Sequence, residues 1–488
     1  MSILLVVDRV EDWPLDIPEV EVTKARSYLR DAELASRRGL KVFNLCRNYR
    51  YQSLGYYVSL LAEARGHRPL PSVATVQDLR HRSLLRLVSE DLEATIQRSL
   101  ATLAGDEFEL SVYFGRNVAA RHRRLALALF NLFPVPLSRA RFFRSANGWE
   151  LRSLRPIAAR EIPPGHHDFV VEVAREFFGK RRTSPSPSRR YRYDLAILVN
   201  PREKEPPSDE VALRRFVKAG HDVGFDVQLI EPEDYGRLAE FDALFLRETT
   251  HVQHHTYRFA RRAEAEGLVV LDDPGSILRC TNKVFLAEAL HRAGIPTPAT
   301  WIVDRQNLTS VARAMTYPAI LKLPDGSFSR GLSRVASKEE LIATARGYLD
   351  TSDLVLAQEF VPTEFDWRIG ILAGEVLYAA RYAMAKGHWQ IIQRDAQGRV
   401  RHYGGVEAVP VGDVPDAVRQ AALGAAALMG DGLYGVDLKS RDDRVYVIEV
   451  NDNPTLESGM EDSVIGADLY RRIMEEFLRR VERRKERR

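Results

Sequence analysis

The chain has 488 residues, of which 45% are hydrophobic and 28% charged, a globular composition that excludes disorder over most of its length. This length is too great for one hydrophobic core and predicts about three domains. The net charge is only +4, and Lys180–Arg190 and Arg479–Arg488 each carry a net +5. The remainder is therefore net negative, which argues against a basic nucleic-acid-binding fold.

Cysteine content and apolar runs indicate the compartment. Cys46 and Cys280 are too few for a disulfide framework or a thiolate zinc site. The N-terminal stretch Met1–Asp8 lacks a basic region and is typical of a buried strand rather than a signal peptide. Because the longest apolar run, Leu125–Phe130, is far shorter than the roughly 20 residues of a membrane span, we expect a cytoplasmic protein without a membrane partner.

A basic Ser/Pro-rich segment at residues 179–191 predicts a solvated, extended linker. Before it, Ile3–Val7 and Glu107–Tyr113 predict strands, and Thr23–Arg38 predicts a helix capped by Thr23 and ended by Gly39. Residues 1–178 are therefore expected to form an α/β domain. Its sequence shows no catalytic constellation.

Alternating strands and helices resume after the linker. Tyr193–Val199, Val223–Ile230, Phe241–Leu246 and Leu268–Leu271 are strand candidates separated by helices. This spacing predicts a small, doubly wound parallel sheet over residues 192–275. No G-x-G-x-x-G follows the first strand, which argues against a dinucleotide site. Residues 276–488 contain more hairpin signals and predict an α+β module rich in antiparallel strands.

The hairpin Leu433–Val450 contains the best-defined candidate site. With its turn centred near residue 443, Asp437 and Glu449 become cross-strand partners on one face, and Asn451 shares that face. Opposed carboxylates repel each other unless a cation lies between them, and this oxygen set suits magnesium that holds nucleotide phosphates. The alternative is the solvated polar face of an edge hairpin.

Cations interrupt several apolar segments nearby. Lys322 lies in an apolar strand before the Gly/Ser loop Asp325–Gly331, which has backbone N–H groups suited to phosphates, although a simple hairpin loop would look the same. Lys283 opens a helix, where a cation opposes the helix dipole. Arg368 and Arg381 interrupt strands and could neutralise phosphoryl charge.

Two further features are weaker. Arg247 ends a strand where open α/β sheets bind ligands, and is a candidate for contacting a substrate carboxylate. His251–His255 contains three histidines, but we see no adjoining carboxylate ligand and do not expect zinc there.

The order of these motifs resembles that of the ATP-grasp superfamily over residues 192–480, and most closely its RimK-like carboxylate–amine ligases, which include the ribosomal-protein glutamate ligase. The matching elements are Asn282-Lys283, Ile295-Pro-Thr-Pro298, Lys322, Gln358-Glu-Phe-Val361, Asp366-Trp-Arg368, Arg381, Asp437 and Glu449-Val-Asn451. The first part of the chain resembles the RimK-like ATP-grasp N-terminal domain, whose chemistry is unknown.

The resemblance implies a role for each matching position. For ATP it implies Lys283, Lys322, Asp366 and the segment Gln358, Glu359, Phe360 and Val361, with Ser327, Ser329 and Gly331 in a lid. For two Mg²⁺ ions, with Mn²⁺ able to substitute, it implies Asp437, Glu449 and Asn451. Arg381 would stabilise the transferred phosphoryl group, with Arg368 as a second catalytic residue. The chain departs from the glutamate ligases at Gly387–Ile391 and after Asn451, so His388, Trp389 and Asn453 are candidates for the acceptor pocket.

The expected function is formation of an amide bond through an acyl phosphate, on an amino acid, a small peptide or a protein terminus. One alternative is a kinase of the same fold that phosphorylates a small molecule without amine capture. Another is an ATP-regulated ribosome- or RNA-binding protein; nucleic acid is expected only through the basic C-terminal tail. The sequence leaves open whether the chain forms a homo-oligomer.

Overall fold

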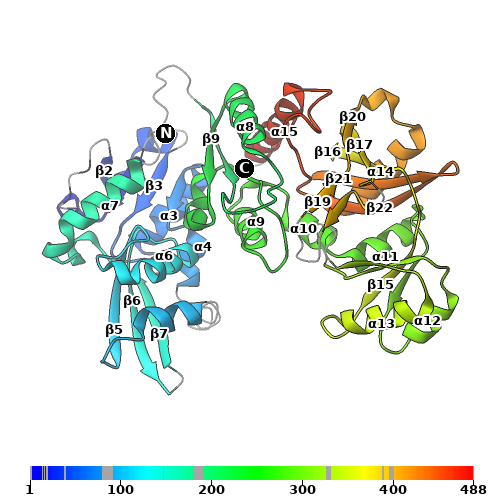
Figure 1. Ribbon diagram of the computed structural model, residues 1–488. Helices are drawn as coiled ribbons and strands as arrows, with labels where there is room; N and C mark the ends of the chain where they lie inside the picture. Colours follow the sequence, from blue (N-terminus) through cyan, green and yellow to red (C-terminus); the bar gives the residue numbers. More distant parts are fainter. Residues whose placement is uncertain are drawn as a thin grey trace. The chain divides into compact units, whose positions relative to one another are not determined.

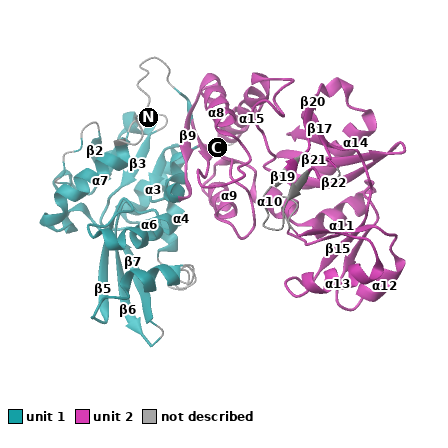
Figure 2. Cartoon of the chain, viewed as in Figure 1, with its two compact units in different colours: residues 1–193, 233–241 teal, residues 194–232, 242–488 magenta. Residues whose placement is uncertain are grey.

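The computed structural model describes residues 3–486 except 14, 16, 18, 19, 38, 39, 80–91, 147, 180–190, 326–330, 387, 388 and 395–399. The chain divides into two compact units, residues 1–193 with 233–241 and residues 194–232 with 242–488 (Figure 2). Most of the predicted linker lies outside the described residues. The domain boundaries at 178, 192 and 276 stay a prediction.

The first unit combines a parallel sheet with an antiparallel one (Figure 1). The parallel sheet has the order β2-β1-β3-β4, with β1 (Ile3–Val7), β2 (Glu21–Lys24), β3 (Lys41–Asn44) and β4 (Arg68–Leu70). The antiparallel sheet contains β5 (Glu107–Tyr113), β6 (Leu137–Ser145) and β7 (Gly148–Pro156). The helices include α1 (Ala25–Arg30), α2 (Ala32–Ser36), α3 (Leu54–Ala64), α4 (Val73–Asp78), α6 (Arg123–Leu132) and α7 (His167–Gly179). Apolar side chains from both sheets share one core.

The helix predicted over Thr23–Arg38 is instead a strand end followed by two short helices. Thr23 lies in β2, and α1 ends before Asp31. The Asp31 carboxylate accepts the backbone N–H groups of Glu33 at 2.8 Å and Leu34 at 3.1 Å. An aspartate that accepts these N–H groups starts a new helix. The sequence of Thr23–Arg38 looks like one continuous helix and gives no sign of the break between α1 and α2.

The second unit begins with the parallel sheet expected from the sequence. Its order is β11-β10-β8-β9, from β8 (Tyr193–Leu198), β9 (Phe225–Ile230), β10 (Ala243–Leu246) and β11 (Val269–Leu271). Strand β10 pairs in parallel with both β8 and β11. The prediction that Gly224 lies within a strand is wrong. Gly224 instead ends α8 (Glu210–Val223) with a left-handed φ of 103°, a conformation that glycine adopts without a steric penalty.

Two larger antiparallel sheets and the two-stranded pair of β18 (Ile392–Arg394) and β19 (Val400–Tyr403) follow, which confirms the α+β class of this part. One contains β12 (Thr300–Val303), β15 (Val355–Glu359), β13 (Ala319–Lys322) and β14 (Leu332–Val335). The other contains β20 (Val406–Val409), β17 (Glu375–Ala383), β16 (Phe365–Leu372), β21 (Leu433–Arg441) and β22 (Arg444–Asp452). The helices of this unit include α9 (His255–Ala265), α10 (Pro274–Thr281), α11 (Lys283–Ala293), α12 (Leu308–Ala314), α13 (Lys338–Tyr348), α14 (Asp416–Met429) and α15 (Ala467–Glu486). Helix α14 packs on one face of the five-stranded sheet.

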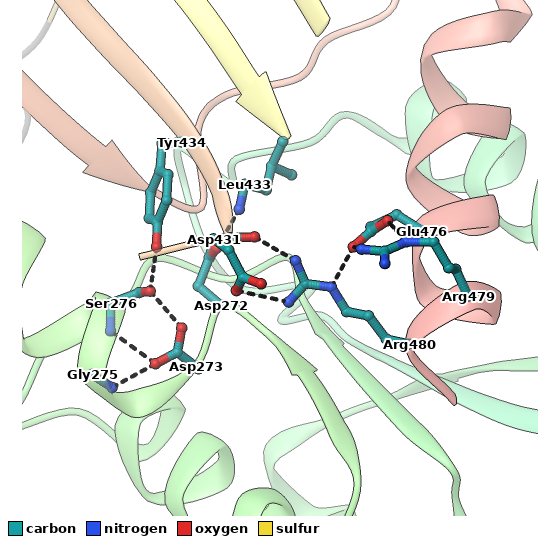
Figure 3. A network of polar contacts seen from close by, with 10 residues as sticks. All are labelled: Asp272, Asp273, Gly275, Ser276, Asp431, Leu433, Tyr434, Glu476, Arg479 and Arg480. Atoms are coloured by element: carbon teal, nitrogen blue, oxygen red, sulfur yellow. Dashed lines mark hydrogen bonds and ion pairs between the residues drawn. The ribbon is translucent and has the colours of Figure 1, made fainter. Parts of the chain in front are cut away.

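The basic C-terminal helix α15 is bonded to the rest of its unit. Figure 3 shows Arg480 between Glu476 and Asp431, the residue that precedes β21 by two positions. The remaining links are Arg484 with the carbonyl of Leu268 at 2.8 Å and Lys485 with Asp242 at 3.2 Å. Three cations of the basic tail therefore have partners within the unit. No helix in the described part of the chain is both long and apolar enough to cross a membrane.

Candidate active site

A cavity of about 530 Å³ is lined by residues of the four-stranded and the five-stranded antiparallel sheets of the second unit. One sheet contributes residues of β13, β14 and β15, and the other contributes residues of β16, β17, β21 and β22. The segments 204–207, 249–251 and 453–455 and the residue Glu457 also line it. Most of the residues predicted to bind nucleotide or metal, or to take part in catalysis, line this cavity: Lys283, Lys322, Gln358, Glu359, Phe360, Val361, Asp366, Arg368, Asp437, Glu449 and Asn451.

The hairpin β21–β22 places the three predicted metal ligands on one face. Asp437 is the register partner of Glu449, and Asn451 is the partner of Gly435. The pairing depends on a β-bulge, because Leu438 pairs with Val447 and one extra residue in β22 follows. In regular pairing without the bulge, Ile448 would stand opposite Asp437 and Glu449 would lie on the opposite face, since side chains alternate along a strand. The predicted convergence is confirmed.

Three rows of side chains cross this face of the five-stranded sheet. Tyr382 stands opposite Asp366, Ala380 opposite Arg368, and Tyr378 opposite Gly370. Arg368 in turn pairs with Asp437, and Gly370 with Gly435. A Cβ atom on Gly370 would lie 2.0 Å from the Tyr378 ring. Glycine is therefore required in this row, since the ring lies directly over the backbone there.

The Asp437 carboxylate is bound by an arginine. Arg368 donates from Nε to Oδ1 at 2.7 Å and from Nη2 to Oδ2 at 2.8 Å. The amide of Asn451 also donates to Oδ2 at 3.2 Å. Asp437 raises the pKa of Arg368 well above its ordinary value, although burial alone would lower it. Three hydrogen bonds thus hold the Asp437 carboxylate in place at the cavity wall.

The Glu449 carboxylate faces two buried lysines. Lys283 Nζ lies 2.7 Å from Glu449 Oε1, and the Lys283 and Lys322 residues are each 7% exposed. Burial lowers the pKa of Lys322 to about 8, while Glu449 raises it and Lys283 lowers it. Burial alone would raise the pKa of Glu449, but Lys283 and Lys322 hold it below its usual value. Two ammonium groups therefore accompany one carboxylate here, an excess of positive charge that suits an anionic ligand.

These groups fit a metal-bound nucleotide. The side chains of Asp437, Glu449 and Asn451 supply the hard oxygen ligands that Mg²⁺ prefers. The two lysines supply point charges for phosphate oxygens. Apolar side chains of Ile320, Leu332 and Ile448 complete the wall in which a base can lie.

A second lysine–carboxylate pair at the site was not foreseen. Lys439 Nζ lies 2.5 Å from Asp366 Oδ1 and 2.8 Å from Thr363 Oγ1. Burial raises the pKa of Asp366 despite Lys439. The alternation of β21 could have indicated Lys439, because it shares a face with Asp437. Tyr382 also lines the cavity and was missed.

The predicted nucleotide-binding segment closes one wall. The Gln358 amide donates to Thr300 Oγ1 at 2.8 Å, which fixes its orientation. The ring of Phe360 lies 6.2 Å from that of Trp389, edge to face, and the Arg334 guanidinium lies 4.8 Å from the Phe360 ring. Trp389, proposed for the acceptor pocket, therefore lines the cavity beside the nucleotide segment.

The structure corrects the placement of Arg381. Its register partners are Trp367 and Glu407, and Trp367 belongs to the core under α14. The Arg381 guanidinium lies 4.7 Å from the Trp367 ring and its Nη1 is 3.8 Å from Glu407. Since facing residues of antiparallel strands share a face, Arg381 is on the side opposite Arg368 and does not line the cavity. Its predicted contact with phosphate is not supported.

The structure likewise places Arg247 away from a substrate. The residue is 1% exposed, and Nε donates to Ser208 Oγ at 3.0 Å and Nη1 to Asn453 Oδ1 at 2.7 Å. The Nη2 group donates to the carbonyls of Pro207 and Pro454. Arg247 does not line the cavity, and the Asn453 side chain, which does, is used to hold it. At the end of β10, Arg247 therefore holds neighbouring segments of the unit together rather than contacting a substrate.

Some predicted residues cannot be placed. Ser327 and Ser329 of the lid, and His388 of the acceptor pocket, lie outside the described residues. Gly331, the last residue of the lid, has a left-handed φ of 71° and accepts the N–H of Leu323 at 2.9 Å. The segment His251–His255 does have an adjoining carboxylate, contrary to expectation, since Glu248 contacts His255 at 2.6 Å.

Comparison with known proteins identifies the two parts of the chain. A protein-family model described as RimK-like ATPgrasp N-terminal domain matches residues 25–173. A second, described as RimK-like ATP-grasp domain, matches residues 280–477, which include the cavity residues from Cys280 onward.

Two relatives are similar to about half of the chain. The alpha-aminoadipate–LysW ligase LysX of Saccharolobus solfataricus is 25% identical over 256 residues, which cover 49% of this chain and 88% of the relative. A protein of Legionella pneumophila named "Probable alpha-L-glutamate ligase" is 28% identical over 224 residues, which cover 45% and 71%. Both are named as ligases, in agreement with the predicted enzyme class.

Solved structures include a RimK domain ATP-grasp protein from Sphaerobacter thermophilus, with a TM-score of 0.45 and 16% identity over 58% of this chain and 98% of that one. The two family matches, in the predicted order, confirm the predicted resemblance. The chain therefore belongs to the RimK-like ATP-grasp proteins and carries both their N-terminal domain and their ATP-grasp domain.

Proposed function

We propose that this protein is an ATP- and Mg²⁺-dependent ligase that joins a carboxylate to an amine through an acyl phosphate. The observation that carries the proposal is the convergence of Asp437, Glu449 and Asn451 with the buried Lys283 and Lys322 in one cavity. This set can neutralise a triphosphate and the charge that moves during phosphoryl transfer, and it requires no protein nucleophile.

Each residue has a distinct task in this proposal. Lys283 and Lys322 bind phosphate oxygens, and Lys283 exchanges its bond to Glu449 for a phosphate. Asp437, Glu449 and Asn451 would hold two magnesium ions, which when bound neutralise the β- and γ-phosphates. Arg368, already at the Asp437 carboxylate, then lies beside the transferred group and offsets its charge.

The chemistry has two steps. A carboxylate oxygen attacks the γ-phosphorus, the bond to the β-phosphate oxygen breaks, and ADP leaves. The amine then attacks the acyl carbon, phosphate leaves with the C–O bonding electrons, and the nitrogen loses a proton. The cavity walls near Thr250 and His251, outside the nucleotide-binding set, offer polar groups for the amine-bearing substrate.

The proposed substrates are amino acids, small peptides or protein termini. The names of the two relatives support an amino-acid or protein partner, since they specify alpha-aminoadipate with LysW and alpha-L-glutamate. Opposite charges at Lys204, Glu205 and Glu457 on the cavity wall suit a zwitterionic substrate.

The test is a screen of amino-acid and peptide pairs for Mg²⁺-dependent ADP release by the full chain. We expect release that needs both an acid and an amine, together with an amide product in the mass spectrum. Glu449→Gln should bind metal nucleotide poorly and lose turnover while its circular dichroism is unchanged. Turnover retained in this variant would contradict the metal assignment.

ADP release that needs no amine, accompanied by a stable phosphorylated product, would instead establish the kinase alternative. A matched control is Glu482→Gln, which removes a carboxylate of the same type from α15, away from the residues that line the cavity. Its turnover should equal that of the wild type.

A further inference from the structure

A cluster of two histidines and a glutamate lies at the carboxyl edge of the parallel sheet in the second unit. Glu248 follows β10 by two residues, and His254 and His255 begin α9. The side-chain ligand atoms of these three residues all lie within 4.8 Å of one another. None of the three lines the cavity described above.

The topology places this cluster at a crevice. In the order β11-β10-β8-β9, the chain leaves β8 toward β9 on one side and returns to β10 on the other. Adjacent loops at the carboxyl ends of β8 and β10 therefore diverge, which is where open α/β sheets hold ligands. Asn200 follows β8 and Glu248 follows β10, and the Asn200 amide donates to Glu248 Oε1 at 2.8 Å.

The two imidazoles converge on one buried carboxylate. His255 Nε2 is 2.6 Å from Glu248 Oε2, and His254 Nε2 is 3.9 Å from Oε1. The Glu248 side chain is 2% exposed. Consecutive helical residues normally point in different directions, but His254 is the N-cap, with extended backbone angles, and its ring centroid lies 3.9 Å from that of His255.

Hydrogen bonding fixes the free nitrogen of His254. The Thr256 hydroxyl donates its single proton to the carbonyl of Thr249 at 3.3 Å, so it accepts from His254 Nδ1 at 3.2 Å. The proton of the neutral ring is then on Nδ1, and the Nε2 lone pair faces the Glu248 carboxylate. Two acceptors that face each other attract a cation between them. This arrangement, with an outer partner that fixes the ring, is the one that metal-binding histidines adopt.

We propose that Glu248, His254 and His255 bind one first-row transition-metal dication such as Zn²⁺, separate from the magnesium site. Bonds of about 2.0–2.1 Å to a tetrahedral ion separate ligand atoms by about 3.3 Å. The distances from the Glu248 oxygens to His255 Nε2 and His254 Nε2, 2.6 and 3.9 Å, lie on either side of that value, so small side-chain shifts would bring the ligand atoms to the spacing that the ion needs. Two imidazoles with one carboxylate favour zinc over magnesium, which prefers oxygen ligands.

The ion has a structural role. The segment between its ligands includes Thr249, Thr250 and His251, which line the cavity. A metal bound at both ends of this segment fixes that wall, and no step of the proposed ligase reaction passes through it. The inference does not depend on the proposed function, because it concerns metal binding alone.

The test uses the full chain after treatment with a chelator, in saturating Mg²⁺. Co²⁺ is added as a spectroscopic probe and Zn²⁺ as a competitor. We expect one equivalent of Co²⁺, with visible bands that report nitrogen ligands, displaced by one equivalent of Zn²⁺. His254→Ala and Glu248→Gln should abolish the bands, and Asn200→Ala should weaken affinity by about 10- to 100-fold.

Two controls isolate the site. His291→Ala removes an exposed histidine of α11, and Glu449→Gln alters the proposed magnesium site; both variants should keep the bands. His254 is 41% exposed at its side chain, so His254→Ala should fold even if Glu248→Gln does not. Absence of the bands in the wild type, or equal bands in His254→Ala, would overturn the proposal.

Discussion

Arg368 and Asp437 form a bidentate ion pair at the candidate active site, with contacts of 2.7 and 2.8 Å. The two residues are register partners on β16 and β21, and each side chain is 16% exposed. Two parallel N–H···O bonds are the strongest geometry available to this pair. The pair also places a guanidinium at a carboxylate that the proposed function assigns to magnesium.

Arg368→Met should therefore make stability depend more strongly on magnesium. Removal of the guanidinium leaves the Asp437 carboxylate without its main partner, which should lower the free energy of unfolding by about 3–5 kcal/mol in metal-free buffer. Mg²⁺ should restore part of this loss, because it neutralises the same carboxylate. Urea unfolding with and without Mg²⁺ measures both effects.

The matched control is Arg313→Met, which removes an exposed arginine of α12. Its unfolding free energy should change by less than about 0.5 kcal/mol, with the wild-type response to magnesium. If Mg²⁺ stabilised Arg368→Met no more than the wild type, Asp437 would not be a metal ligand.

The lowered pKa of Lys322 should make nucleotide binding depend on pH. Burial lowers its pKa from 10.5 to about 8, with Glu449 opposing and Lys283 adding to this shift. The ammonium form, which attracts phosphate, predominates below pH 8. ATP affinity should therefore fall above pH 8, by up to about tenfold per pH unit. Calorimetric titrations at pH 7, 8 and 9 measure this, and Lys322→Arg should remove the dependence because arginine keeps its charge.

Stability of the ligand-free chain should change in the opposite direction through the same lysine. Between pH 8 and 10.5 the unfolded chain binds the Lys322 proton and the folded chain does not, so the contribution of this group to stability rises with pH. Lys322→Met should weaken the pH dependence of ATP affinity and that of the free energy of unfolding. Equal slopes in wild type and variant would show that the lysine has an ordinary pKa.

The hairpin shows how far the sequence could predict the site. Its turn residues Asp442 and Asp443 both have positive φ, and strand alternation is enough to place Asn451 beside Glu449. In a regular hairpin with this two-residue turn, Asp437 would pair with Ile448. The bulge makes Glu449 its partner instead. Val445 and Val447 pack on the core at a spacing of two residues, whereas the next core residue, Val450, follows after three, and this change of spacing is the sequence trace of the extra residue.

The neighbouring strand β17 could not be predicted in the same way. Apolar residues occur on both of its faces, so no alternation tells which of Arg381 and Tyr382 faces the cavity. Register with β16 decides this, and it selects Tyr382. The pair of Asp366 and Lys439 depends likewise on contact between strands 73 residues apart, which requires the sheet order and not the local pattern.

A substitution of Arg247 can distinguish a structural role of this residue from a role in substrate binding. Its pKa is lowered to about 10 by burial, and its donors are bonded to Ser208, Asn453 and nearby carbonyls. Arg247→Lys leaves some of these acceptors unsatisfied and should lower the free energy of unfolding by about 1–3 kcal/mol. Below the unfolding transition, KM for the carboxylate substrate should be unchanged. A tenfold rise in KM at wild-type stability would restore the substrate role.

Tyr382 and Tyr378 form a natural pair for testing buried hydroxyl groups at the site. Both are on the cavity face of β17. The Tyr382 hydroxyl donates to Glu461, which is 1% exposed, and its ring lies 4.7 Å from the Arg368 guanidinium. The Tyr378 hydroxyl is buried and has no hydrogen-bond partner in the described part of the chain.

Tyr382→Phe should lower the free energy of unfolding by about 1–3 kcal/mol, because Glu461 keeps a buried oxygen without its donor. The ring over Arg368 remains, so kcat should change less than in Tyr382→Ala. Tyr378→Phe should leave stability unchanged or raise it, since it removes a hydroxyl that has lost its hydration. Urea unfolding of the two variants side by side gives the comparison, and a larger loss in Tyr378→Phe would show that the hydroxyl of Tyr378 contributes more to stability than that of Tyr382.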